Sequence, residues 1–171
     1  MNTPFVIASV VAVASTLMVI TRTNVVHALL YLIVSLLSVS LVFFLLGAPF
    51  IAALEIIIYA GAIMVLFVFV VMMLNLGPQS KNQERMWLTP EVWTGPAVLA
   101  VILMGELVYI LTSTGGITPS GKTVPVGDIG FALFGPYLLG VELASMLLLA
   151  GIVGAYHLGR RSNDDEQKEE S

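Results

Sequence analysis

Cysteine is absent from the 171 residues of this chain, and only 11% of the residues are charged. Without cysteine the chain has no disulfide, no thiolate zinc site, no cysteine-ligated iron–sulfur cluster and no c-type haem attachment. A soluble domain has about 25% charged and about 45–50% apolar residues. This chain is 58% apolar, with a mean hydropathy of +0.99. The composition indicates a polytopic membrane protein, whose redox chemistry, if any, must lie elsewhere.

Five apolar stretches reach or approach the roughly 20 residues that a helix needs to cross the ~30 Å hydrocarbon layer. They lie at 4–21, 25–46, 50–75, 95–113 and 136–158. We therefore predict an all-α membrane protein with a five-helix transmembrane domain over residues 1–159. The first stretch has no Lys or Arg before it and is interpreted as a retained helix rather than a signal peptide. The Gly- and Pro-rich residues 114–130 are predicted to form an irregular loop.

The basic residues of the connections predict the direction of the chain. One side would carry five cations and the other only Lys122; the five are Arg22, Lys81, Arg85, Arg160 and Arg161. Because Lys and Arg concentrate in cytoplasmic loops, the N-terminus is expected outside and the C-terminus in the cytoplasm. The last stretch, 160–171, is predicted to be an acidic, disordered cytoplasmic tail.

Three carboxylates lie inside the long apolar runs: Glu55, Glu106 and Glu142. A charged side chain within the bilayer costs a few kcal/mol, so it is expected to face protein or water and to have a function. Removal from water favours the protonated carboxyl, which suits such a group for taking up and releasing protons. The alternative is a neutral carboxyl that only bridges helices. We rank Glu55 first as a proton relay, Glu142 second and Glu106 last.

The residues after Glu55 favour this ranking. Tyr59 lies four positions further on, where its hydroxyl can donate to the carboxylate or hold a water beside it. Ala60, Gly61 and Ala62 then remove side-chain bulk from one level of the helix. That level could be a hinge that unwinds locally, for example as a π-bulge, or only a packing notch for a neighbouring helix.

The fifth apolar stretch carries Gly140, Ala144 and Gly151 on one face, and this stripe of small residues is interpreted as a helix-packing surface. His27 and His157 fall near helix ends, too shallow for the axial ligands of a membrane haem. No nucleotide-binding glycine motif occurs. We expect no cofactor or metal bound by this chain and no nucleic-acid partner.

The run from Ala53 to Asn75, ALEIIIYAGAIMVLFVFVVMMLN, resembles the J-subunit family of the proton-pumping NADH:quinone oxidoreductase, respiratory complex I. Residues 23–31 and 134–150 extend the resemblance, which reaches to about Gly159. It implies a five-helix subunit of the membrane arm in a bacterial inner membrane, near the quinone-binding end. It also implies packing against subunits A, H, K and N, with NADH, FMN, iron–sulfur clusters and quinone held by neighbouring subunits.

The family's third helix is associated with a π-bulge at the segment that matches Tyr59 to Phe67, whose rotation opens or closes a water path. The resemblance therefore implies a deformable segment made of Ala60, Gly61, Ala62, Met64, Val65 and Phe67. One departure is Val25, where family members commonly have Pro at a first helical position. Glu106 matches no motif of the family.

The chain is thus predicted to be a non-catalytic subunit that couples quinone reduction to proton translocation. Glu55, Tyr59 and Glu142 would form the proton relay. Two alternatives stay open at this point. One is a subunit of a multi-subunit cation/proton antiporter, which could use the same carboxylates without electron flow. The other is a structural subunit that seals neighbouring helices.

Overall fold

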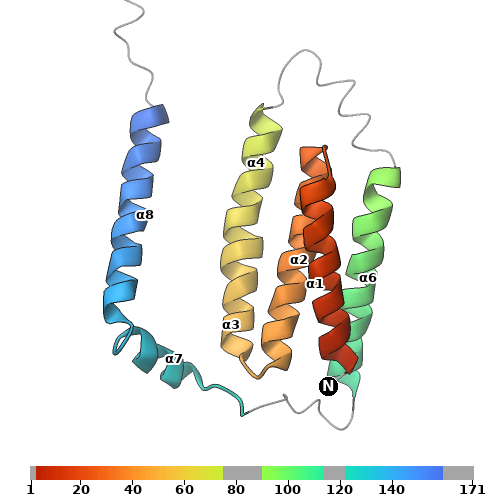
Figure 1. Ribbon diagram of the computed structural model, residues 1–171, viewed down its shortest axis with the longest axis horizontal. Helices are drawn as coiled ribbons and strands as arrows, with labels where there is room; N and C mark the ends of the chain where they lie inside the picture. Colours follow the sequence, from red (N-terminus) through yellow and green to blue (C-terminus); the bar gives the residue numbers. More distant parts are fainter. Residues whose placement is uncertain (1–2, 75–89, 114–121, 160–171) are drawn as a thin grey trace, which may run out of the picture. The chain divides into compact units, whose positions relative to one another are not determined.

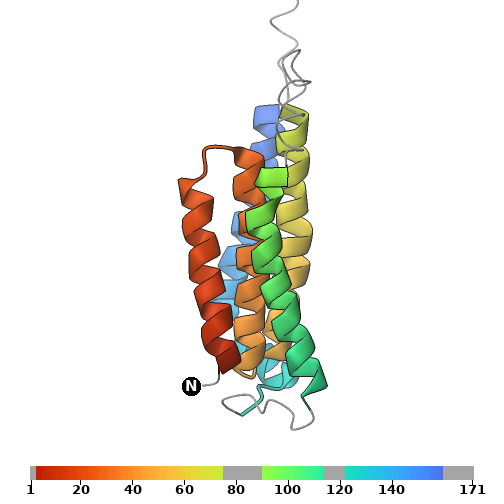
Figure 2. The same ribbon diagram turned by 90° about the vertical axis from the view of Figure 1, so that its right-hand side faces the viewer.

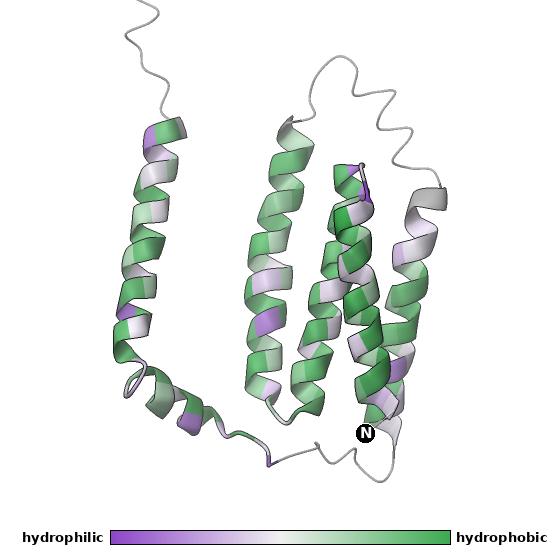
Figure 3. Cartoon of the chain, viewed as in Figure 1, coloured by the Kyte–Doolittle hydropathy of each residue, from purple (hydrophilic) through white to green (hydrophobic). Residues whose placement is uncertain are grey.

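The computed structural model describes residues 3–74, 90–113 and 122–159, and these residues form helices and short connections without any strand. Five helical segments are long and apolar enough to cross a membrane, as predicted: Thr3–Thr21, Val25–Leu45, Pro49–Met73, Trp93–Thr112 and Leu138–Gly159. Figure 3 shows these segments coloured as hydrophobic along most of their length. The predicted acidic tail lies outside the described residues, as do Lys81 and Arg85.

The chain divides into two compact units, residues 1–125 and 126–171. The first contains α1 (Thr3–Thr21), α2 (Val25–Leu45), α3 (Pro49–Leu54), η1 (Glu55–Ile63), α4 (Met64–Leu74) and α6 (Pro90–Thr112). The short helices α3, η1 and α4 follow one another without a break and together make the third span (Figure 1).

Helix α2 is the centre of the first unit, because α1, α3, η1, α4 and α6 all pack against it (Figures 1 and 2). The core is formed by Ala8, Val11, Val34, Leu41, Leu45, Leu103 and Ile110. Small polar residues tie the first two helices together within this core: Ser38 Oγ donates to the Ala8 carbonyl at 2.6 Å, and the hydroxyls of Thr16 and Ser35 lie 2.8 Å apart. Such interhelical hydrogen bonds let helix backbones approach closely in a membrane.

The ends of α2 are fixed by local chemistry. Asn24 caps its start, since Oδ1 accepts from the N–H groups of Val26 at 3.0 Å and His27 at 3.3 Å. The helix therefore begins at Val25 without the proline common in the family. After α2 the chain turns at Gly47, whose φ of 88° suits glycine, and α3 begins at Pro49.

The second unit contains α7 (Val126–Leu133) and α8 (Leu138–Gly159). The prediction of an irregular loop over 114–130 is wrong for residues 126–130, which belong to α7. Gly127 and Gly130 suggested a break, but Val126, Ile129 and Leu133 are spaced so that they share one face of a helix. Within this unit, no residue of α8 is buried.

Candidate functional site

The third span changes its helical geometry at the first acidic residue within it. From Glu55 to Ile63 the backbone is a π-helix, in which hydrogen bonds join residues five positions apart; the Met64 N–H, for example, donates to the Tyr59 carbonyl. The α-helical turns of α3 precede it and those of α4 follow it. Because π-helical turns are rare and are frequently found at functional sites, this segment is the candidate site.

The π-helix lies earlier in the chain than the resemblance implied. It begins at Glu55 rather than Tyr59 and ends at Ile63 rather than Phe67. Ala60, Gly61 and Ala62 lie within it, whereas Met64 caps its end and Val65 and Phe67 belong to α4. Met64 is only 2% exposed, so the π-helix ends at a tightly packed side chain. Val65 and Phe67 point away from the core and are 61% and 54% exposed.

Gly61 is the one glycine in η1. A Cβ at this position would lie 3.1 Å from the carbonyl oxygen of Ile56, five residues back in the chain. That distance is shorter than an ordinary van der Waals contact, so the carbonyl would have to move. The π geometry brings Ile56 and Gly61 together, and the sequence supplies glycine where it does so.

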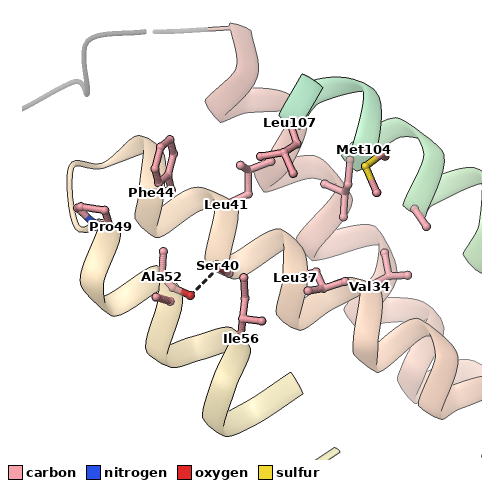
Figure 4. Close-up of a pocket in the computed structure, with 13 residues that line it drawn as sticks. Val34, Leu37, Ser40, Leu41, Phe44, Pro49, Ala52, Ile56, Met104 and Leu107 are labelled. Carbon is pink, nitrogen blue, oxygen red and sulfur yellow. Dashed lines mark hydrogen bonds between the residues drawn. The ribbon is translucent and has the colours of Figure 1, made fainter. Parts of the chain in front are cut away.

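A hydrogen bond from α2 reaches the backbone of α3 just before η1 begins. Ser40 Oγ is buried and donates to the Ala52 carbonyl at 2.8 Å, as Figure 4 shows. The same carbonyl accepts from the N–H of Glu55, the first residue of η1. A side chain that inserts into the hydrogen-bond ladder disturbs a regular helix. The hydroxyl of Ser40 therefore gives a local reason for the change of geometry at this point.

Glu55 and Tyr59, the first two members of the predicted relay, both lie in η1. Glu55 is half-buried, and Tyr59 is 49% exposed within this chain. Among the hydrogen bonds of the described residues, none joins these two side chains. Glu55 and Tyr59 thus lie one turn apart on a helix that this chain covers only in part. Their polar groups are open to a neighbouring subunit or to water.

A cavity of about 440 Å³ lies beside the beginning of η1. Its walls come from α2, α3, η1 and α6 (Figure 4), and they are formed by Val34, Leu37, Ser40, Leu41, Phe44, Pro49, Ala52, Ala53, Ile56, Ala100, Leu103, Met104 and Leu107. The only side-chain polar group among them, Ser40 Oγ, already donates to Ala52. The cavity is therefore apolar, and it gives the first turn of η1 space to change its packing.

Glu142 and the small residues Gly140, Ala144 and Gly151 are all exposed on α8 in the second unit. A Cβ added at Gly140 or Gly151 would meet no atom within 4 Å. Within the described part of the second unit, no residue covers this stripe.

Glu106 is the acidic residue that the sequence ranked last, yet it is the most buried of the three. It is 7% exposed, and neither of its carboxylate oxygens has a hydrogen-bond partner in the part of the chain that the structure describes. A signal was present in the sequence: Leu103, Glu106 and Ile110 are spaced at three and four residues, and all three are buried on one face of α6.

Three polar side chains, Arg22, His27 and Tyr31, lie together near the start of α2. Tyr31 is 4% exposed and stacks on His27 with ring centroids 5.0 Å apart, while the Arg22 guanidinium lies 5.7 Å above the Tyr31 ring. The Tyr31 hydroxyl fills the space next to Gly95 on α6, so that a Cβ at Gly95 would collide with it. Sequence reasoning predicted His27 at a helix end but not this contact between helices.

Comparison with known proteins shows the family of this chain. Residues 15–158 match the family described as NADH-ubiquinone/plastoquinone oxidoreductase chain 6. The chain belongs to this family. A Pseudomonas aeruginosa protein named NADH-quinone oxidoreductase subunit J is 61% identical over 166 residues, which cover 94% of this chain and 98% of the relative. The Escherichia coli K12 protein of the same name is 57% identical over 166 residues, covering 97% and 90%.

More distant relatives carry the same name. The subunit J of Buchnera aphidicola subsp. Schizaphis graminum is 49% identical over 156 residues, covering 91% of this chain and 96% of the relative. The similarity extends over nearly the whole length of each protein. The family match includes α2, the whole third span and all but the last residue of α8. The resemblance stated from the third-span sequence is therefore confirmed at the level of the family.

Proposed function

We propose that this chain is a membrane-arm subunit of a proton-pumping NADH:quinone oxidoreductase and couples quinone reduction to proton translocation. Membership of the family and five candidate membrane spans support this proposal. The family, with relatives from bacteria, supports a place in a bacterial inner membrane. The distribution of Lys and Arg supports an N-terminus outside and a C-terminus in the cytoplasm. Its partners would be subunits A, H, K and N and the lipid bilayer.

The observation that carries the mechanism is the π-helix that begins at Glu55. A π-helical segment holds an extra residue compared with an α-helix of the same number of turns. If η1 becomes α-helical, the extra residue has to be taken up by the rest of the span. The helix that follows, α4, then rotates by about 100° and shifts by about 1.5 Å along its axis. Tyr59 would then change its direction relative to Glu55, which opens or closes a water path beside the carboxyl.

The contacts of η1 keep the free-energy cost of a change from π to α geometry low. No residue of η1 is fully buried among the described residues, so α2 covers its side chains only in part. Ala60, Gly61 and Ala62 add little bulk at the level that turns, and the 440 Å³ cavity beside Ile56 leaves room for repacking. Close-packed interiors resist movement because they have no free volume. The small residues and the cavity support a deformable segment, and its change would turn Val65 and Phe67 together with the buried Met64.

In this proposal the chain handles protons and not electrons. Glu55 takes up and releases a proton, Tyr59 donates to the carboxylate or holds its water, and Glu142 of α8 serves as a second carboxyl. NADH, FMN, the iron–sulfur clusters and the quinone belong to neighbouring subunits, so the subunit is non-catalytic in itself. Gly140, Ala144 and Gly151 provide the surface on which a partner helix packs.

Two substitutions test the two parts of this proposal in membranes that contain the assembled complex. Glu55→Gln keeps the shape of the side chain but removes the exchangeable proton. Gly61→Leu places a side chain against the Ile56 carbonyl and so disfavours the π form. We expect both variants to lose proton pumping and quinone-linked NADH oxidation, while oxidation of NADH by an artificial electron acceptor continues.

Gly105→Leu is the matched control for Gly61→Leu, because a Cβ at Gly105 meets no described residue within 4 Å outside the neighbouring turn of its own helix. Glu55→Asp is the control for Glu55→Gln, since it keeps a carboxyl group. The proton relay is wrong if Glu55→Gln pumps at the full rate in complete complexes. The hinge is wrong if Gly61→Leu does so, and full activity of both supports a structural sealing role instead.

A further inference from the structure

Glu106 on α6 has no part in the mechanism proposed above, and its surroundings are unusual. Its side chain is 7% exposed in the isolated chain, and partner subunits or lipid can only reduce that fraction. Both carboxylate oxygens lack a hydrogen-bond partner among the described residues. A buried polar group without a partner is uncommon in folded proteins and calls for a physical reason.

The element opposite Glu106 is the first turn of α1. A cavity of about 360 Å³ lies between the two helices, lined by Thr3, Pro4 and Ile7 of α1 and by Ile102, Glu106 and Tyr109 of α6. Glu106 lies six residues before Thr112, where α6 ends, which is about 9 Å along the helix axis. The cavity is thus near the end of the bundle where α1 begins, within reach of interfacial water.

Among the described residues that line this cavity, none supplies a counter-ion to the carboxyl. In the described parts of α1 and α6, Tyr109 is the only other titratable side chain lining the cavity. The titratable residues of α2, His27 and Tyr31, lie near its first residue, which follows the far end of α1. No cluster of three or more metal-binding side chains occurs in the described residues. A proton is therefore the ligand that suits the site, since an isolated ionised carboxylate is very costly in an apolar environment.

We propose that Glu106 is a proton-binding site that exchanges with water at the end of the bundle where α1 begins, through the cavity between α1 and α6. The hydroxyls of Thr3 and Tyr109 at the cavity wall are groups to which entering water can hydrogen-bond. The site does not depend on η1 or on Glu55. Failure of either proposal therefore leaves the other standing.

A hydrophobic carbodiimide tests this assignment, because it reacts with protonated carboxyl groups in apolar surroundings. The acid adds across one C=N bond of the reagent and the product rearranges to an N-acylurea, so that the whole reagent stays on the side chain. Membranes with the assembled complex would be treated with dicyclohexylcarbodiimide over a range of pH, and the peptides of this chain analysed by mass spectrometry.

We expect the peptide with Glu106 to gain the mass of one carbodiimide, and Glu106→Gln to abolish this adduct in a complex that still assembles. Labelling should fall as pH rises through the range in which the carboxyl releases its proton. Asp128 in α7 is an exposed carboxylate outside the five candidate spans and should stay unlabelled. An unmodified Glu106 at every pH, or equal labelling of Glu106 and Asp128, would overturn the proposal.

The route through the cavity has its own matched pair of variants. Ile102→Phe enlarges a side chain of the cavity wall and should slow labelling of Glu106 several-fold. Val101→Phe makes the same kind of change one residue earlier, at a side chain that is 70% exposed and does not line the cavity, and should leave the labelling rate unchanged. Equal rates in the two variants would overturn access by this route.

Discussion

Ser40 on α2 donates a hydrogen bond of 2.8 Å to the backbone carbonyl of Ala52, three residues before the third span changes from α to π geometry. The bond joins the central helix of the first unit to the segment in which we place the function. It is buried, so water does not compete for either partner. The position of η1 along the span is thus coupled to a side chain of another helix.

Removal of this hydroxyl should loosen the start of η1. A buried hydrogen bond contributes about 0.5–1.5 kcal/mol, and its loss leaves the Ala52 carbonyl with one donor fewer. We therefore expect Ser40→Ala to accelerate hydrogen exchange of the backbone amides around Ala52 and Ile56 in the purified complex. Thr112→Ala is the control, since Thr112 Oγ1 bonds only to carbonyls of its own helix. Unchanged exchange in Ser40→Ala would show that the bond does not hold η1.

A single methyl group at Gly61 should shift η1 toward the α form. Ala is better than Gly in an α-helix by about 1 kcal/mol, and in the π form its Cβ would lie 3.1 Å from the Ile56 carbonyl oxygen. The contact disfavours the π form, and the propensity shows that Ala is well tolerated in the α form. Density maps of the complex with Gly61→Ala should show an α-helix through residues 55–63 in a larger share of particles than the unmodified complex.

Gly105→Ala gives the baseline for this comparison, because it offers the same gain in helix propensity with no contact at the new Cβ. It should leave η1 as it is. An equal share of π-helical particles in Gly61→Ala and Gly105→Ala would contradict the role given to Gly61.

A side chain at Gly95 should disrupt the contact between α2 and α6. The new Cβ of Gly95→Ala would collide with the Tyr31 hydroxyl, and overpacking of this kind costs about 1–3 kcal/mol. Tyr31→Phe removes the hydroxyl, so the double variant should regain part of the lost thermal stability. The measurement is the unfolding temperature of the detergent-solubilised complex. A double variant as unstable as Gly95→Ala alone would mean that Tyr31 is not the residue in conflict.

Bulk on the small-residue stripe of α8 should affect assembly and not the fold of this chain. A Cβ at Gly140 or Gly151 meets no neighbour within the second unit, so a defect of Gly140→Leu or Gly151→Leu would not arise from the packing of that unit. We expect a smaller yield of complete complex on native gels. Leu149→Trp is the control, because residue 149 lies on the opposite face of α8 from Gly140. Equal assembly of all three variants would remove the stripe from the partner surface.

The sequence was sufficient for the features that depend on length and local composition. Five apolar stretches predicted five spans, because crossing a bilayer sets a minimum number of apolar residues. Ala60, Gly61 and Ala62 predicted a level with little side-chain bulk, and all three lie in η1. Both inferences use neighbouring residues only, which a sequence displays directly.

Features that depend on contacts between distant residues were not predictable in this way. The start of η1 coincides with a hydrogen bond from Ser40, twelve residues before Ala52, and the space beside Gly95 is filled by Tyr31 of another helix. Glu106 was ranked last because its neighbours matched no motif. Its burial follows from the packing of α6 against α1 and α2, which the spacing of Leu103, Glu106 and Ile110 hinted at but did not establish.

The two ends of the third span differ. Its first end, at the turn between α2 and α3, is held by hydrogen bonds, and its second half has exposed side chains. At the first end, the Gly47 carbonyl accepts from the Val124 N–H at 2.9 Å, and Ser40 holds Ala52. In the second half, the side chains of Val65 to Val70 are all exposed. A change of geometry within η1 would therefore rotate α4, while α3 keeps its position.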